Sequence, residues 1–75
     1  MSPKLPRVTS EEATRALERL GFSSSRQSGS HKIYKNAQGK RVTVPFHKGR
    51  VLHPKVLKSI LRDAELSVQE FIKFL

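Results

Sequence analysis

The stretch RQSGSHKIYKNAQGKRVTVP, residues 26–45, decides the fold, because short polar and apolar segments alternate in it and are broken by glycine. With the residues just before it, this pattern predicts three strands. The three segments are residues 22–28, 30–35 and 40–45. Asn36 to Gly39 has the composition of a hairpin loop, so the second and third strands should pair antiparallel.

The third strand predicts a sheet with one buried face and one open face. Val42 and Val44 alternate with Arg41 and Thr43, and side chains alternate between the two faces of a strand. We therefore expect basic side chains on the face that meets solvent.

A helix is predicted before the strands, starting at Ser10. Thr9 and Glu12 have the spacing of a capping box. Apolar residues then recur at helical spacing on one side of the helix, at Ala13, Ala16, Leu17 and Leu20. Gly21 tolerates the left-handed conformation that ends many helices, so the helix should stop there.

Two more helices are predicted after the strands. Pro54 suits the first turn of the second helix, and Ser67 with Glu70 forms another capping box that opens a short last helix. This last helix should include four residues that are too apolar for a free tail, Phe71, Ile72, Phe74 and Leu75.

These elements predict one α+β domain over residues 1–75, with residues 1–7 loose. Each main helix has a single apolar stripe, so both should cover the same face of a three-stranded antiparallel sheet. That order, with a short C-terminal helix added, is the layout of a double-stranded-RNA-binding domain.

The charge distribution indicates a polyanionic or acidic partner. The chain has 15 Lys and Arg against six Asp and Glu, a net charge of +9, and no acid lies between residues 19 and 62. Such a basic surface suits nucleic acid or an acidic protein. The chain lacks cysteine and a long apolar run, so we expect a cytoplasmic protein without a membrane span.

Three segments of the chain resemble the HicA family of bacterial toxins. They are LERLGF at residues 17–22, GSHKIYKNAQGKRVTVPFHKGRVLHPKVLKSIL at residues 29–61, and the final helix. The most specific element is Gly29-Ser30-His31, followed by Val44-Pro45-Phe46-His47. His53-Pro54-Lys55 departs from the pattern, because a glycine-containing turn is expected there.

The resemblance implies a small ribonuclease that acts on messenger RNA and is paired with a HicB-type antitoxin. In that family the histidine of the G-S-H element is regarded as catalytic, which implies His31 here. The antitoxin is expected to cover His31 and the basic face with an acidic or blocking surface.

The residues themselves favour a reaction that needs neither metal nor cofactor, because the acid-free middle offers no carboxylates to hold an ion. RNA carries its own nucleophile, the 2′-hydroxyl, and His31 is the candidate general base. Alternation groups His31 with Ile33, which we expect to be buried. The ring therefore either leans into the core or is freed by a bulge at Gly29-Ser30.

Further site residues are predicted around His31. His47 is a candidate proton donor to the leaving oxygen or a loop residue of the basic rim, and Gly29 and Ser30 are either phosphate contacts or ordinary turn residues. The predicted RNA-binding cations are Arg26, Lys32, Lys35, Lys40, Arg41 and Lys48. His53 should be a helix cap or a surface residue, and Tyr34 either covers the core or stacks on a base.

Two other functions fit the same sequence. The chain could be an RNA-binding module of the double-stranded-RNA-binding type that does not cut RNA, or a small adaptor whose basic face docks an acidic protein.

Overall fold

The computed structural model describes residues 4–75 and contains three helices and three strands. Their bounds are α1 Ser10–Arg19, β1 Ser23–Ser28, β2 His31–Lys35, β3 Arg41–Pro45, α2 Pro54–Ala64 and α3 Val68–Lys73. The sheet has the order β1-β2-β3, and both pairings are antiparallel. The predicted layout is therefore confirmed.

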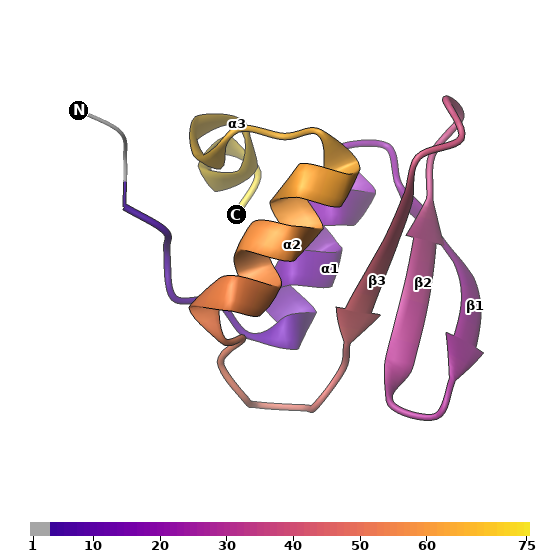
Figure 1. The fold of residues 1–75 in the computed structure, drawn as a ribbon, viewed down its shortest axis with the longest axis horizontal. Coiled ribbons are helices and arrows are strands. Elements are labelled where there is room, and N and C mark those ends of the chain that lie inside the picture. The colour runs from indigo at the N-terminus through magenta and orange to yellow at the C-terminus, as the bar shows by residue number, and fades with distance from the viewer. Residues whose placement is uncertain (1–3) are drawn as a thin grey trace.

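Both main helices lie on one face of the sheet, as predicted (Figure 1). The core between them contains Tyr34, Val42 and Val44 from the sheet, all at most 2% exposed. From the helices it contains Ala13, Ala16, Leu17, Leu57, Ile60, Leu61 and Ala64. The other face of the sheet is left uncovered by either helix.

Helix α1 begins and ends where its local signals predict. Thr9 Oγ1 accepts a hydrogen bond from Glu12 N at 3.2 Å, and Thr9 N donates to Glu12 Oε1 at 2.9 Å. At the other end Gly21 has φ 99°, and Phe22 N donates to Leu17 O at 2.9 Å. This last bond is the six-to-one bond of a Schellman motif, which turns the chain sharply into β1.

Helix α2 begins without the expected glycine turn, because His53 caps it. The His53 Nδ1 accepts from Lys55 N at 3.1 Å, and Pro54 occupies the first turn. The prediction that His53 is a cap is confirmed. The glycine of this connection lies earlier, at Gly49, where φ is 77°.

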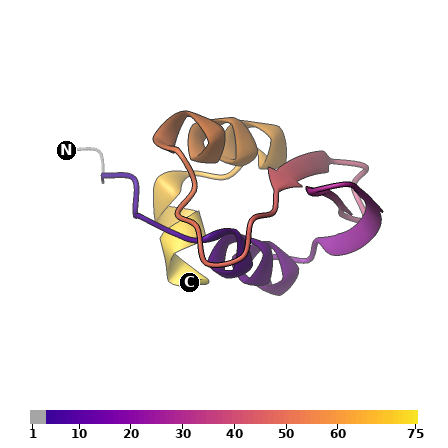
Figure 2. The same ribbon diagram turned by 90° about the horizontal axis from the view of Figure 1, so that it is seen from below.

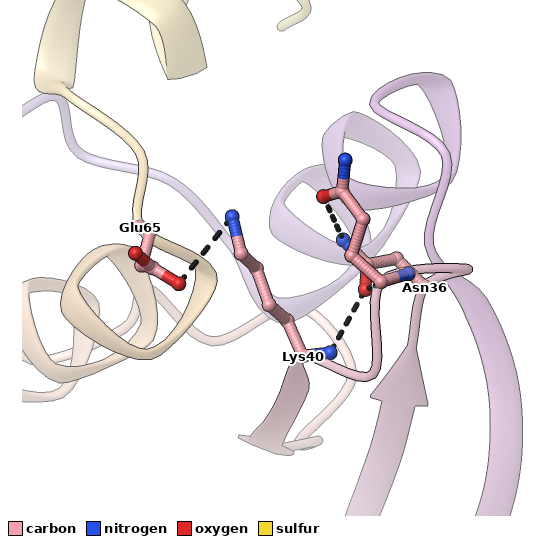
Figure 3. A network of polar contacts seen from close by, with 4 residues as sticks. Asn36, Lys40 and Glu65 are labelled. Carbon is pink, nitrogen blue, oxygen red and sulfur yellow. Dashed lines mark hydrogen bonds and ion pairs between the residues drawn. The ribbon is translucent and has the colours of Figure 1, made fainter.

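The two hairpins have different turns. Gly29 has φ 58° and Ser30 does not have a positive φ, the pattern of a two-residue type II′ turn that leaves Ser28 opposite His31. In the longer loop Asn36 Oδ1 accepts from Gln38 N at 3.1 Å and Lys40 N at 2.9 Å. Figure 3 shows this loop and the ion pair of Lys40 with Glu65, 3.4 Å between Nζ and Oε2.

The short helix α3 follows its predicted capping box, in which Glu70 N donates to Ser67 Oγ at 3.1 Å. Only part of the apolar end is buried. Phe71 is 0% exposed, whereas Ile72, Phe74 and Leu75 are 37–43% exposed. A six-residue helix presents only one of its sides to the domain, and Phe74 and Leu75, which were expected within the helix, lie beyond its end.

Residues 1–3 of the stretch expected to be loose lie outside the described residues. Leu5 is half-buried and packs against the core. Among the helices of residues 4–75, none combines the length and the apolar character that crossing a lipid bilayer requires.

Candidate active site

The uncovered face of the sheet, here called the open face, is defined by strand register. Tyr34 pairs with Val42 and Lys32 with Val44, so these four residues share the helix-facing side. The residues between them point the other way. The open face therefore carries Arg26, Ser28, His31, Ile33, Lys35, Arg41, Thr43 and Pro45.

His31 is exposed and lies on the open face at the start of β2. It pairs with Ser28 on one side and with Pro45 on the other. The alternative that its ring leans into the core is wrong. His31 does share a face with Ile33, but Tyr34 is the buried residue of this strand, so the pair faces solvent.

The ring nitrogens of His31 make no hydrogen bond to another side chain or to the backbone within residues 4–75. The imidazole is thus free to accept a proton from a bound molecule. Its orientation has to be set by that molecule and by the flanking residues Ser28 and Pro45.

Arg26 lies on the same face, because the turn pairs Ser28 with His31 and the register is unbroken from there to Arg26 and Ile33. Ser24 pairs with Tyr34, so Ser25 is an extra residue, a β-bulge. In an unbroken register Ser24 would oppose Lys35 on the open face, so the bulge changes the side of Ser24 and not that of Arg26. The bulge therefore lies in β1, and not at Gly29-Ser30 as expected.

Arg26 and His31 are diagonal neighbours across β1 and β2, since Ser28 is the direct partner of His31. Such diagonal positions are about 7–8 Å apart. A phosphate bound between them could meet the guanidinium of Arg26 while the imidazole faces the adjacent ribose. The prediction that Arg26 faces the same phosphate stays a prediction, with a geometry that allows it.

The other predicted cations are divided between different surfaces. Lys35 and Arg41 pair with each other at the far end of the open face. Lys32 lies on the helix-facing side, with its Nζ 3.9 Å from the centre of the Phe46 ring. Lys40 is half-buried beside Glu65, and Lys48 is exposed in the loop after β3.

The loop of residues 46–53 leaves the end of β3 on the side of the helices, next to the turn that precedes His31. Phe46 N donates a hydrogen bond to Ser30 O, which joins this loop to the turn that precedes His31. The turn and the loop lie together at the lower end of the molecule in Figure 1. His47 is exposed in this loop, so the two histidine-bearing segments are neighbours.

Ser10, in the first turn of α1, holds the start of this loop. Its side chain is buried, at 1% exposed. Its Oγ donates to Pro45 O at 2.9 Å and accepts from His47 N at 3.3 Å. The hydroxyl thus satisfies the last carbonyl of β3 and the amide of His47 together. Figure 2 shows the loop passing the first turn of α1 before it reaches α2.

Glu11 holds the middle of the same loop. Gly49 N donates to both carboxylate oxygens of Glu11, at 3.1 Å and 3.3 Å. This bond lowers the pKa of Glu11 below its ordinary value of 4.5, and the Glu11 amide and the cations Lys48 and Arg15 add to the effect. Leu52 N donates to Val8 O at 2.8 Å and fixes the end of the loop.

Gly29 and Ser30 contribute to the site through the backbone. A side-chain carbon at Gly29 would meet nothing within 4 Å, so the glycine is required for its φ of 58° and not for space. The carbonyl of Ser30 accepts from Phe46. The turn reading of both residues is confirmed, and a contact of either with phosphate stays a prediction.

The three strands carry no acidic residue. Within residues 4–75, no three His, Asp or Glu side chains gather in a group that could hold a metal ion. The chemistry available at the open face is thus that of an imidazole beside cations.

Sequence reasoning missed Ser10, Glu11 and the bulge. The capping box does put Ser10 at the first helical position, but its partners Pro45 and His47 lie more than thirty residues away. No local sequence pattern predicts a contact over such a separation in the chain.

Replacement of Ser10 by Ala should destabilise the protein. The carbonyl of Pro45 and the amide of His47 would lose a partner in a partly buried place, which costs about 1 kcal/mol, the low end of the range for buried groups. Urea unfolding measures the loss. Ser24→Ala in the exposed strand β1 is the matched control and should stay within about 0.5 kcal/mol of wild type. An equally small change for Ser10→Ala would contradict this role of its hydroxyl.

The hold of Glu11 on the loop should depend on pH. Because the folded-state pKa is lowered, the bond contributes fully above pH 4.5 and is lost as the pH falls through the lowered value. The amide proton shift of Gly49, followed by NMR, should titrate with a midpoint below 4.5. Glu11→Gln should abolish that titration and Glu70→Gln should keep it. A Gly49 titration that persists in Glu11→Gln would refute the assignment.

Comparison with known proteins supports the family resemblance of the sequence. The family model described as the HicA toxin of bacterial toxin-antitoxin matches residues 10–66, more than half of the chain. This span includes His31, the loop after β3 and helix α2. A search of curated proteins finds no significant match. The chain belongs to the HicA family of toxins from bacterial toxin-antitoxin systems.

Proposed function

We propose that this HicA-family protein is a metal-independent endoribonuclease, an mRNA interferase, with His31 as the general base. The single observation that supports the proposal best is the exposed imidazole of His31 on an acid-free, basic sheet face. An exposed base beside phosphate-binding cations is what cleavage through the 2′-hydroxyl requires.

The reaction balances without a further reactant. His31 takes the proton of the 2′-hydroxyl, the 2′-oxygen forms a bond to the adjacent phosphorus, and the bond from phosphorus to the 5′-oxygen breaks. The products are a 2′,3′-cyclic phosphate and a new 5′-hydroxyl. DNA lacks the 2′-hydroxyl, so it should bind without being cut.

The leaving 5′-oxygen needs a proton, and His47 is the candidate donor. It is exposed in the loop that Ser10 and Glu11 hold, and its neighbour Phe46 is hydrogen-bonded to Ser30. This arrangement keeps His47 close to the turn that precedes His31. Water is the alternative donor, in which case His47 belongs to the basic rim.

Phosphate binding is assigned to the cations of the open face, Arg26, Lys35 and Arg41, with Lys48 in the adjacent loop. Arg26 also neighbours His31, so it can neutralise charge that develops on the reacting phosphate. Lys32 and Lys40 were predicted in this set. Their contacts with Phe46 and Glu65 favour structural roles instead.

The antitoxin would be of the HicB type and would cover His31 and the open face. The three strands contribute no negative charge of their own. An acidic partner surface would therefore associate quickly, at a rate that falls with ionic strength.

The second candidate is an RNA-binding module that does not cut, because the same layout serves in double-stranded-RNA-binding domains. In that case His31 would be an ordinary surface residue. Cleavage assays separate this candidate from the first.

His31→Ala should lower the cleavage of a defined RNA by about 10²-fold or more, as expected for the loss of a general base. RNA affinity should stay within a few fold, because the cations remain. Gel-resolved cleavage rates and binding of the same RNA measure the two effects. Wild-type activity should persist in EDTA.

His53→Ala is the matched control, since it removes an imidazole from a helix cap rather than from the open face. With RNA at saturating concentration, and at a temperature where the fold is intact, it should retain its cleavage rate. A wild-type protein that leaves RNA intact without its antitoxin, or one that EDTA inactivates, would overturn the proposal.

Arg41→Ala and Lys32→Ala should differ in the salt dependence of RNA binding. Each phosphate contact contributes about one unit to the slope of log affinity against log salt. Arg41→Ala should lower the slope by about that amount, whereas Lys32→Ala should leave it unchanged because it faces the helices. Fluorescence anisotropy at several salt concentrations measures both. Equal changes would show that RNA does not distinguish the two faces.

A further inference from the structure

A hollow of about 250 Å³ lies beside the candidate active site. Its floor is apolar, with Leu52, Val56 and Pro45, and its rim carries His47, Arg50 and His53. The floor comes from β3, α2 and the connection between them. The apolar floor and the cationic rim together suit a flat group that has apolar faces and is attached to a phosphate.

The hollow reaches the end of the sheet that carries His31, and the two share Pro45. Pro45 lines it and is also the direct strand partner of His31. His47 lines it as well, one residue after the hydrogen bond between Phe46 and Ser30. An RNA strand that has one phosphate at His31 therefore has its next nucleotide within reach of the hollow.

The polar atoms that line the hollow are largely committed to the fold. Ser10 uses its Oγ for Pro45 and His47, and His53 Nδ1 accepts from Lys55 N. The hollow has no acidic lining residue. The floor side chains of Pro45, Leu52 and Val56 have no polar group with which to read the edge of a base, whereas imidazole and guanidinium planes can stack on its face.

We propose that this hollow holds one unstacked nucleobase of single-stranded RNA, from the nucleotide next to the phosphate at His31. The site rests on the proposed function for its substrate, since the strand that enters it is the strand to be cut. Recognition is by stacking and apolar contact, so it tolerates different bases but requires that a base be present.

A site of this kind should make the protein prefer single-stranded RNA to a duplex. A base in a duplex is stacked and paired and cannot enter a hollow beside its own backbone. A base of unpaired RNA does not have to break a base pair before it enters the hollow. The domain therefore differs from a reader of double-stranded RNA although it shares the layout.

The first test uses His31→Ala protein, which keeps RNA intact, and two strands of equal length. One is a short single-stranded RNA, and the other is its ribose-phosphate chain without bases. The methyl NMR signals of Leu52 and Val56 should shift on binding RNA and not on binding the abasic chain, because only bases carry ring currents. The Val68 methyls, on α3, should not respond to either strand.

The second test compares affinities for the same two strands. Val56→Trp fills the hollow and should lower the preference for RNA over the abasic chain by about tenfold, the size of one base-stacking contact. Arg50→Ala, at the exposed rim, should lower it as well without a risk to the core. Arg62→Ala is the matched control, because it removes the same charge from the far end of α2.

The outcomes separate this site from the nuclease proposal. If wild-type protein cuts RNA but the Leu52 and Val56 methyls shift equally with both strands, the base site is refuted and the nuclease stands. If RNA stays intact but the methyls and the affinity ratio behave as expected, the base site stands and the nuclease falls. An unchanged ratio in both Val56→Trp and Arg50→Ala also overturns the base site.

Discussion

The candidate site depends on one buried hydroxyl, that of Ser10. A serine hydroxyl can donate one hydrogen bond and accept others, and here it donates to the end of β3 and accepts from the loop that follows. Because the capping box fixes Ser10 at the start of α1, the position of the loop follows from where the helix begins. Glu11, one residue later, extends the same control to Gly49. The residue at which α1 begins therefore also fixes the position of the loop that borders the candidate site.

Strand register is the second constraint, and it decides which cations can act together. The two-residue turn at Gly29 makes His31 the direct partner of Ser28, and strand alternation then places Arg26 on the face of His31. Lys32 is the next residue along the chain, yet it faces the helices. The basic residues of the acid-free stretch are thus divided between two surfaces of the protein. Only the open face can hold a phosphate beside His31.

Local sequence signals predicted most of the fold. Which side chains lie on which face of the sheet could be seen only in the tertiary structure. The capping boxes, Gly21 and the loop at Asn36 depend on hydrogen bonds within a few residues, so their sequence signals were sufficient. Ile33 was assigned to the core because it is apolar, but Tyr34 occupies the core through the opposite parity. A single strand carries no signal that chooses between the two. The register of β1 and the burial on α3 likewise arise from contacts between distant segments.

The location of the acids explains how a domain with few of them keeps one face wholly basic. All six belong to a helix or to its end. Four of them have a local role there, since Glu12 and Glu70 cap helices, Glu65 pairs with Lys40, and Glu11 holds Gly49. The sheet has none, so the charges of Arg26, Lys35 and Arg41 are uncompensated on the open face. Their field attracts a polyanion before any contact forms. An acidic surface is therefore the electrostatic complement of this face.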